Sequence, residues 1–81
     1  SLSLAYFALD KGGNMPCILN AANEVVVEAF LNNRLKFLQM SNIIETILSK
    51  AFFISHPSYE DFVQTDAMTR QLTKELIANR S

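Results

Sequence analysis

Hydrophobic residues in this chain recur every three or four positions, and turn-forming residues divide them into four segments. Gly occurs only at 12 and 13, Pro occurs only at 16 and 57, and a softer polar break covers 32–41. So few turn residues leave little room for an all-β fold, which needs many turns. We therefore expect four helices, over residues 2–11, 16–33, 41–53 and 58–79.

The second segment, 16–33, is expected to be the central and most buried helix. Its apolar residues cover more than half of the helix circumference; they are Ile18, Leu19, Ala22, Val25, Val26, Ala29 and Phe30. Pro16 suits the first helical position, although Asn20 could cap the helix instead. The run Val25–Val27 is β-branched and would suit a strand, but the helical period over the whole segment outweighs it.

Residues at two segment boundaries are typical of helix ends. Lys11 followed by Gly12 places a cation in the last turn and a glycine after it, which is typical of a helix C-terminus. Ser58 with Asp61 three residues later resembles a capping box, with Asp in place of the usual Glu or Gln. The first helix is therefore expected to end at Lys11, and the fourth to begin near Ser58.

The third and fourth segments each carry an apolar stripe that we expect to be buried. The third helix is expected to begin at Gln39 or Ser41, and whether Phe52–Ile54 forms a short extended piece stays open. The stripes comprise Ile43, Ile44, Ile47, Leu48 and Ala51 in the third helix, and Val63, Ala67, Met68, Leu72, Leu76 and Ile77 in the fourth. Four helices with short connections predict an all-α fold, a small antiparallel bundle of about four helices.

Composition restricts the class of protein. The chain has 81 residues, of which 49% are hydrophobic and 19% charged, so residues 1–81 are expected to form a single globular domain. The formal net charge is −1. Nucleic-acid binding needs a surplus of clustered cations, so no nucleic-acid partner is expected. No stretch approaches the roughly 20 apolar residues of a membrane span, and no basic amphipathic face would bind an anionic membrane.

Three features predict a piece of a larger protein from a reducing compartment. The chain does not begin with Met and has no signal-peptide pattern, so we expect a fragment or a processed product. A domain this small, without a disulfide or a metal, would gain stability from a larger partner surface. The single cysteine, Cys17, cannot form an internal disulfide. This fits a reducing compartment, such as the cytoplasm.

Few residues have the chemistry of a catalytic or metal site. Cys17 and His56 are the only soft metal ligands, whereas zinc takes three or four, so we expect a buried thiol and a loop histidine. A Cys–His nucleophilic pair stays open, because it depends on spatial contact. Glu24 and Glu28 lie one helical turn apart and could bind a divalent ion, although such side chains are more often solvated. Gly12–Gly13 lacks the spaced glycines of a phosphate-binding loop, so we expect a turn there.

Three polar side chains, Asn20, Asn23 and Glu24, interrupt the apolar second segment. One interpretation is a helix cap followed by a solvated face. The other is a polar network that fixes this helix against a neighbouring segment or domain, since buried polar groups need hydrogen-bond partners. Asp66 and Arg70 are spaced to form an ion pair on the fourth helix, in the favourable acid-first order. We expect these five residues to form a structural polar network.

The run Met15–Leu31, with Asn20-Ala21-Ala22-Asn23-Glu24 at its centre, resembles the C-terminal domain of the 1-deoxy-D-xylulose 5-phosphate reductoisomerase family. The resemblance covers essentially the whole chain. Its other elements are Leu4–Ala8, Gly12-Gly13, Arg34–Phe37 and Asp66–Arg70. Two residues depart from the family pattern: Cys17 stands where a small apolar residue is common, and Gln39 stands where an Asp commonly caps the third helix. Neither departure bears on catalysis.

The resemblance implies a part of an enzyme of non-mevalonate isoprenoid biosynthesis. Enzymes of the family rearrange and reduce 1-deoxy-D-xylulose 5-phosphate to 2-C-methyl-D-erythritol 4-phosphate, using NADPH and a divalent metal, Mg or Mn. In the family an N-terminal Rossmann domain binds NADPH, and a central domain supplies the metal carboxylates and the phosphate-binding residues. The C-terminal domain is a helical bundle that braces the central domain, and the enzyme is typically a homodimer. The resemblance also implies a cytoplasmic enzyme, or one in a plastid-type organelle if the source is eukaryotic.

The resemblance therefore assigns no catalytic, cofactor-binding or metal-binding residue to this chain. We expect the 81-residue chain to be inactive alone and to bind neither NADPH nor metal, with the central catalytic domain of the same polypeptide as its partner. The competing hypothesis is a free-standing helical protein-interaction module, which the composition permits equally well. A small metalloprotein is excluded by the number of candidate ligands.

Overall fold

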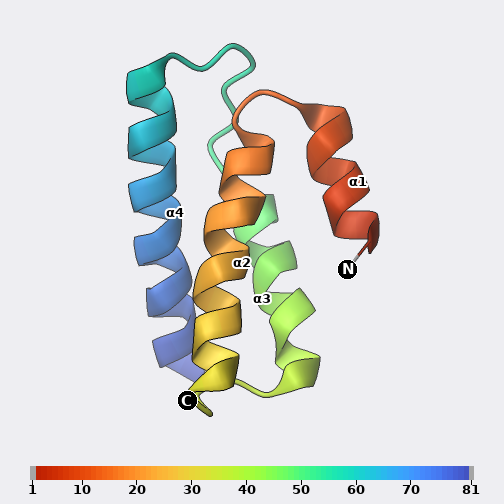
Figure 1. Cartoon of the computed structure of the whole chain (residues 1–81), viewed down its shortest axis with the longest axis vertical. Helices are drawn as coiled ribbons and strands as arrows, with labels where there is room; N and C mark the ends of the chain where they lie inside the picture. Colours follow the sequence, from red (N-terminus) through yellow and green to blue (C-terminus); the bar gives the residue numbers. More distant parts are fainter. Residues whose placement is uncertain (1, 81) are drawn as a thin grey trace.

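The structure, a computed structural model that describes residues 2–80, is an up-and-down arrangement of four helices. The helices are α1 (Leu2–Lys11), α2 (Met15–Leu31), α3 (Phe37–Lys50) and α4 (Tyr59–Arg80). Successive helices run in opposite directions (Figure 1). No strand occurs within the described part of the chain. The predicted all-α antiparallel bundle is confirmed.

α2 is the central helix, as its apolar circumference predicted. It packs against α1, α3 and α4, whereas α1 packs chiefly on α2 (Figure 1). The core cluster is centred on α2 and α3, and it comprises Ala8, Met15, Ile18, Ala22, Val25, Val26, Ala29, Leu35, Ile43, Ile44, Ile47, Leu48 and Ile77. Burying such side chains drives the folding of a helix whose own propensity would be marginal in water.

Two of the predicted helix starts are confirmed. Pro16 lies in the first turn of α2, where its missing N–H costs no intrahelical hydrogen bond. Asn20 lies inside the helix and does not cap it. At the start of α4 the backbone N–H of Ser58 donates to Asp61 Oδ2 (2.9 Å), and the N–H of Asp61 donates to Ser58 Oγ (3.1 Å). These reciprocal bonds form the predicted capping box, with Asp in the acidic position.

The third helix begins earlier than predicted and ends at Lys50, a cation in its last turn. α3 begins at Phe37, so Ser41 lies inside the helix. Gln39 lies in the first turn, where its Oε1 accepts a hydrogen bond from the backbone N–H of Lys36 (2.9 Å). The helix ends before Ala51, whose extended backbone (ψ 140°) leads into a non-helical connection. A glutamine near the start of a helix can thus satisfy a free N–H from inside the helix, which moves the first residue earlier.

The C-terminus of α2 is closed by a left-handed residue. Asn33 has a φ of 61°, a conformation that Asn tolerates better than other side-chain-bearing residues. Its N–H donates to the carbonyl of Phe30 (3.1 Å), and the N–H of Arg34 donates to the carbonyl of Ala29 (2.8 Å). This pair of hydrogen bonds is a Schellman motif, which satisfies the last carbonyls of the helix.

The buried face of α4 differs from the predicted apolar stripe. Three members of that stripe, Val63, Met68 and Leu72, are 46%, 68% and 38% exposed, and only Ile77 is buried. The other buried residues of α4 are Thr65, Thr69 and Thr73. Burial at every fourth position from 65 to 77 defines the face that packs against α2.

Threonine is compatible with this buried face. α2 has small buried residues at the same four-residue spacing, Ala21, Val25 and Ala29. The hydroxyl of Thr73 donates to the carbonyl of Thr69 one turn earlier (2.6 Å), so it needs no partner on α2. The methyl group is then free to pack. The sequence prediction treated Thr as a polar, exposed residue and therefore placed the buried face of α4 on the wrong side of the helix.

One buried side chain, Asn14, ties the α1–α2 turn to the α3–α4 connection; both lie at the same end of the bundle (Figure 1). Its Nδ2 donates to the carbonyl of Phe52 (2.9 Å) and to Thr65 Oγ1 (3.2 Å). Its Oδ1 accepts from the N–H of Ile54 (2.8 Å), and its own N–H donates to the carbonyl of Ile54 (3.0 Å). We call this set of contacts the Asn14 junction.

The adjacent glycine turn fits closely against the same connection. Gly12 and Gly13 have φ values of 71° and 56°, a region that favours glycine. A methyl group on Gly13 would overlap the carbonyl oxygen of Ile54, whereas one on Gly12 would meet open space. The Nζ of Lys11 lies 4.7 Å from the ring centre of Phe53, within range of a cation–π interaction. The glycine pair thus acts as a turn, as the sequence predicted.

Candidate functional site: a polar network between α2 and α4

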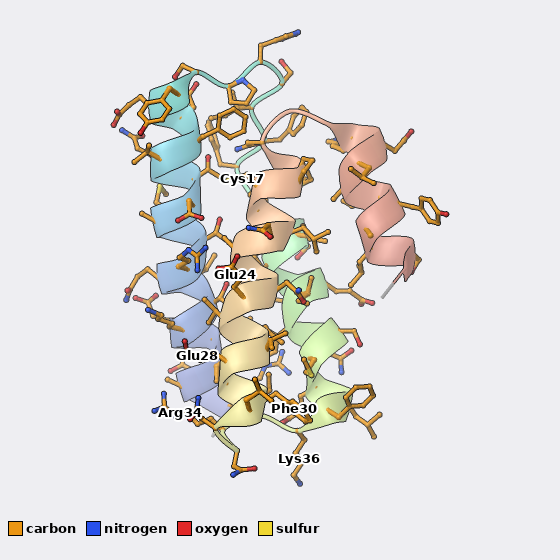
Figure 2. All side chains as sticks on the ribbon, viewed as in Figure 1. Cys17, Glu24, Glu28, Phe30, Arg34 and Lys36 are labelled. Carbon is orange, nitrogen blue, oxygen red and sulfur yellow. The ribbon has the colours of Figure 1, made fainter. Side chains whose placement is uncertain are left out.

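Four of the five residues of the expected polar network lie together on the surface between α2 and α4. Arg70 of α4 donates from Nε to Asp66 Oδ2 (2.9 Å) and from a terminal nitrogen to Glu24 Oε1 of α2 (3.0 Å). Glu24 also accepts through Oε2 from Asn20 Nδ2 (3.2 Å). Figure 2 shows Glu24 on the face where α2 meets α4. The network therefore links the two helices that share the threonine-lined interface.

The charges of this network lie near the surface. The side chains of Arg70, Asp66 and Glu24 are 33%, 43% and 56% exposed. Hydrogen bonds to Asp66 and then to Glu24 raise the pKa of the Arg70 guanidinium above its ordinary value, so it stays charged. Solvent and salt screen exposed ion pairs, so this network adds little to the free energy of unfolding. Its two ion pairs join α4 to α2 at one level along the two helices.

Asn23, the fifth residue, lies outside the network. Its side chain is exposed and makes no hydrogen bond within residues 2–80. It lines a shallow groove between α1 and α2 together with Ala5, Leu9 and Asn20. An amide in this position can still donate and accept hydrogen bonds from a neighbouring segment.

Cys17 and His56 do not form a nucleophilic pair within the described residues. The thiol of Cys17 lies 3.9 Å from the carbonyl of Phe62, while His56 Nδ1 lies 3.1 Å from the hydroxyl of the adjacent Ser55. Partial burial raises the pKa of the Cys17 thiol, the charge of Asp66 raises it further, and Arg70 partly offsets both. A thiol with a raised pKa stays protonated and is a poor nucleophile.

The side chains do not fit a metal ion. Within residues 2–80, no group of three or more His, Cys, Asp and Glu side chains could hold one. Glu24 is engaged by Arg70 and Asn20. Glu28, one turn further along α2, is exposed (Figure 2). Two carboxylates alone fall short of the oxygen ligands that a hard divalent cation requires.

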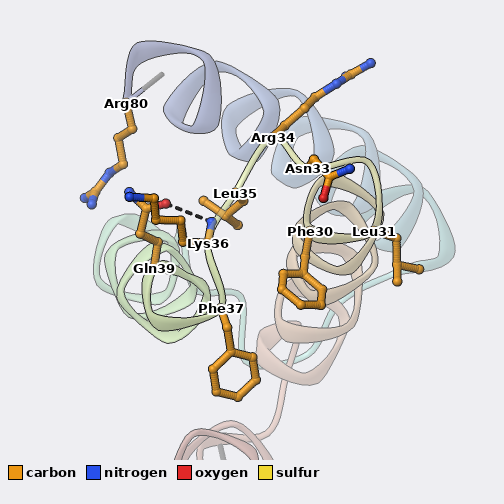
Figure 3. Close-up of a pocket in the computed structure, with 9 residues that line it drawn as sticks. All are labelled: Phe30, Leu31, Asn33, Arg34, Leu35, Lys36, Phe37, Gln39 and Arg80. Atoms are coloured by element: carbon orange, nitrogen blue, oxygen red, sulfur yellow. Dashed lines mark hydrogen bonds between the residues drawn. The ribbon is translucent and has the colours of Figure 1, made fainter.

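A groove at the opposite end of the bundle from the Asn14 junction encloses about 750 Å³ and is lined by Phe30, Phe37, Gln39 and three cations. The cations are Arg34, Lys36 and Arg80. Figure 3 shows Arg34 directed away from Lys36 and Arg80. Cations that diverge in this way do not surround a single anion, so the groove is not a preformed phosphate site.

Within residues 2–80, no helix is both long and apolar enough to cross a bilayer.

Comparisons with known proteins identify the family. A family model described as DXP reductoisomerase C-terminal domain matches residues 1–72. The chain is 54% identical, over 95% of its length, to the 1-deoxy-D-xylulose 5-phosphate reductoisomerase of Bacteroides thetaiotaomicron. It is 52% identical over 98% of its length to the enzyme of the same name from Phocaeicola vulgatus, and 45% identical over 94% to that of Thermodesulfovibrio yellowstonii.

The alignments cover only part of each relative. The chain spans 20%, 21% and 20% of the length of these three proteins, about a fifth. The matching family model describes a C-terminal domain, and it covers far more than half of the chain. The chain therefore belongs to the DXP reductoisomerase C-terminal domain family.

Proposed function

We propose that this chain is the supporting helical domain of a full-length 1-deoxy-D-xylulose 5-phosphate reductoisomerase. The observation that carries the proposal is the 54% identity over 95% of the chain to a relative of that name, of which the chain makes up 20%. The parent protein would rearrange and reduce 1-deoxy-D-xylulose 5-phosphate to 2-C-methyl-D-erythritol 4-phosphate in isoprenoid biosynthesis. We expect a cytoplasmic homodimer.

We further propose that NADPH and the divalent metal, Mg or Mn, bind in the remaining four fifths of the parent. The absence of a metal-binding cluster from residues 2–80 supports this division. The glycine pair supports it too, because Gly13 packs against the backbone of Ile54 rather than leaving space for a phosphate. The domain would then contribute no group to the chemical step and would act by holding the catalytic part in shape.

The polar network would have a structural role within this domain. Arg70 joins Glu24 and Asp66 across α2 and α4, which fixes the register of the two helices. Asn23 lies outside that network; its amide makes no hydrogen bond within residues 2–80 and lies at the edge of the groove between α1 and α2. We propose that this amide hydrogen-bonds to the rest of the parent and orders the junction, without touching substrate.

The test compares the parent enzyme with a version that lacks residues 1–81. NADPH oxidation in the presence of substrate and magnesium should fall by at least 100-fold, while NADPH binding to the truncated protein persists. The 81-residue chain alone should bind neither NADPH nor manganese in titration calorimetry. Unchanged turnover after truncation, or tight NADPH binding by the chain alone, would refute the proposal.

Asn23→Ala in the parent tests the junction role. The variant should lower the melting temperature and turnover together, because the amide is proposed to order the junction. Asn79→Ala, at another exposed asparagine near the end of α4, is the matched control and should change neither. A loss of turnover by Asn23→Ala with unchanged melting would instead place Asn23 at the substrate.

The alternative function is a free-standing helical interaction module. If the natural gene product proves to be only about 81 residues long, that function would replace the proposed role in a reductoisomerase.

A further inference from the structure

α1 covers only part of the surface that α2 presents to it. α1 has 10 residues and α2 has 17, which correspond to about 15 Å and about 26 Å of helix. The two helices are joined by a tight turn and run antiparallel (Figure 1), so α1 lies beside the N-terminal part of α2. About 10 Å of α2, its last two turns, therefore extends beyond α1 on that side.

The surface beyond α1 is apolar. In α2 the positions that face α1 are Pro16, Leu19, Asn20 and Asn23. Spacings of three and four residues continue this stripe to Val27 and Phe30, which are 37% and 36% exposed. We call Val27, Phe30 and Phe37, the first residue of α3, the α1-side patch.

Phe37 joins the patch through its contact with Phe30. The two rings meet edge to face, with centroids 6.1 Å apart and an interplanar angle of 66°. Figure 3 shows both rings directed to the same side of the bundle, the side on which α1 lies. Phe37 is nevertheless 69% exposed, and none of the three patch residues is charged. The same two rings also border the groove lined by Arg34, Lys36 and Arg80. The feature that distinguishes this patch is that two aromatic rings contact each other and still remain exposed, which is typical of a surface that another segment covers.

The direction of α1 indicates which segment that is. α1 begins at Leu2, at the end of the helix away from the glycine turn, and this end points along α2 towards the uncovered turns (Figure 1). The chain aligns with about a fifth of its relatives, and the family model describes their C-terminal domain. In a parent of that length, polypeptide enters the domain at the edge of the α1-side patch.

We propose that the stretch of the parent polypeptide immediately before Ser1 continues from α1 across the α1-side patch and covers Val27, Phe30 and Phe37 with apolar side chains. The proposal rests on the proposed function, since it requires the parent chain. Covering about 10 Å takes about three residues if the segment is extended, or about seven if it continues the helix. The contact would join the incoming chain to both α2 and α3, and so would fix the domain to what precedes it.

Thiol labelling of the full-length parent tests the proposal. Phe37→Cys places a thiol in the patch, and Leu38→Cys, at the neighbouring position that is 83% exposed, is the matched control. Each is made in a Cys17→Ser background, and alkylation by N-ethylmaleimide is followed by mass spectrometry of the peptide concerned. Each is also made in a parent whose ten residues before Ser1 are replaced by a Gly-Ser linker of equal length.

The thiol of Phe37→Cys should react at least tenfold more slowly than that of Leu38→Cys in the parent, and the linker should abolish the difference. Equal rates in the unmodified parent would overturn the proposal, because the patch would then be solvated. Protection that survives the linker would overturn it as well: a distant domain covers the patch if protection is independent of concentration, and a second copy does if dilution removes it. Turnover after removal of residues 1–81 tests the proposed function separately.

Discussion

Replacing Asn14 by Ala should lower the free energy of unfolding by about 3 kcal/mol. The Asn14 side chain is 1% exposed and makes hydrogen bonds to Phe52, Ile54 and Thr65. Alanine would leave a carbonyl, an N–H and a hydroxyl without their partner, and each such loss costs about 1–3 kcal/mol. The lower end of that range applies, because Phe52 is exposed and Ile54 half-buried, so water can reach part of the junction.

A loss of that size is large for a chain of 81 residues. Domains of this length are stable by roughly 0.05–0.15 kcal/mol per residue, or about 4–12 kcal/mol in total. At about 4–8 °C per kcal/mol, the melting temperature should fall by about 15 °C. The loss should also loosen the contact between the α1–α2 turn and the α3–α4 connection, since Asn14 is hydrogen-bonded to both sides of that end of the bundle.

Urea unfolding followed by circular dichroism at 222 nm measures the effect. In the isolated 81-residue chain, Asn23→Ala is the matched control, because that side chain is exposed and makes no hydrogen bond within residues 2–80; without the rest of the parent, its effect should stay within about 0.5 kcal/mol. Asn14→Asp keeps an acceptor for Ile54 but loses both donated bonds and buries a charge, so at pH 7 it should destabilise at least as much as Asn14→Ala. If the free energy of unfolding of Asn14→Ala stays within about 1 kcal/mol of that of the unsubstituted chain, the Asn14 junction is not the main constraint on this end of the bundle.

Three further predictions concern other parts of the molecule. Gly13→Ala should cost more than about 3 kcal/mol and Gly12→Ala only about 1–2, because both residues have positive φ but only the first would strike a backbone carbonyl; urea midpoints will compare them. Thr73→Val should change stability by less than about 1 kcal/mol, since the lost hydroxyl bonds only within its own helix, and calorimetry will show a larger loss only if the hydroxyl has another partner. Cys17 should react with iodoacetamide at a pH midpoint above that of a free cysteine, because burial raises its pKa and the thiolate is the reactive form; a midpoint below that value would contradict the burial.

The four helices could be predicted because each carries its own period and its own ends. The glycine pair, Pro16 and the Ser58–Asp61 capping box mark helix boundaries through contacts within a few residues. The start of α3 was missed for a related reason. Gln39 acts from inside the helix on the N–H of Lys36, and a side chain that caps from the third helical position does not mark the first one.

The buried face of α4 could not be read from hydrophobicity. Thr65, Thr69 and Thr73 are buried in the packed structure, and which face of α4 packs against α2 depends on both helices rather than on one. Some apolar residues of α4 that the sequence pattern predicted to be buried, such as Met68, are exposed instead.

Local spacing also decides which parts of the polar network could be foreseen. Asn20 with Glu24 and Asp66 with Arg70 are each one turn apart, so each pair follows from helix geometry alone. The bond between Arg70 and Glu24 spans 46 positions and depends on how α4 lies against α2. Asn14 presents the same difficulty, since its side-chain partners lie 38 to 51 positions away and nothing near it in sequence indicates them.

The two ends of the bundle carry different kinds of contact, and the difference bears on the role of the domain. At the end that holds the glycine turn, buried hydrogen bonds from Asn14 satisfy the backbone of the α3–α4 connection, although Phe52 and Tyr59 remain 80% and 83% exposed there. Beyond the N-terminus of α1, the aromatic rings of Phe30 and Phe37 contact each other but remain open to solvent on the α1 side. A domain built to act alone would gain by covering or charging that patch. If the proposed function holds, the chain of the longer parent would enter beside this patch, and the contact between Phe30 and Phe37 is where we propose that support passes between this domain and the rest of the enzyme.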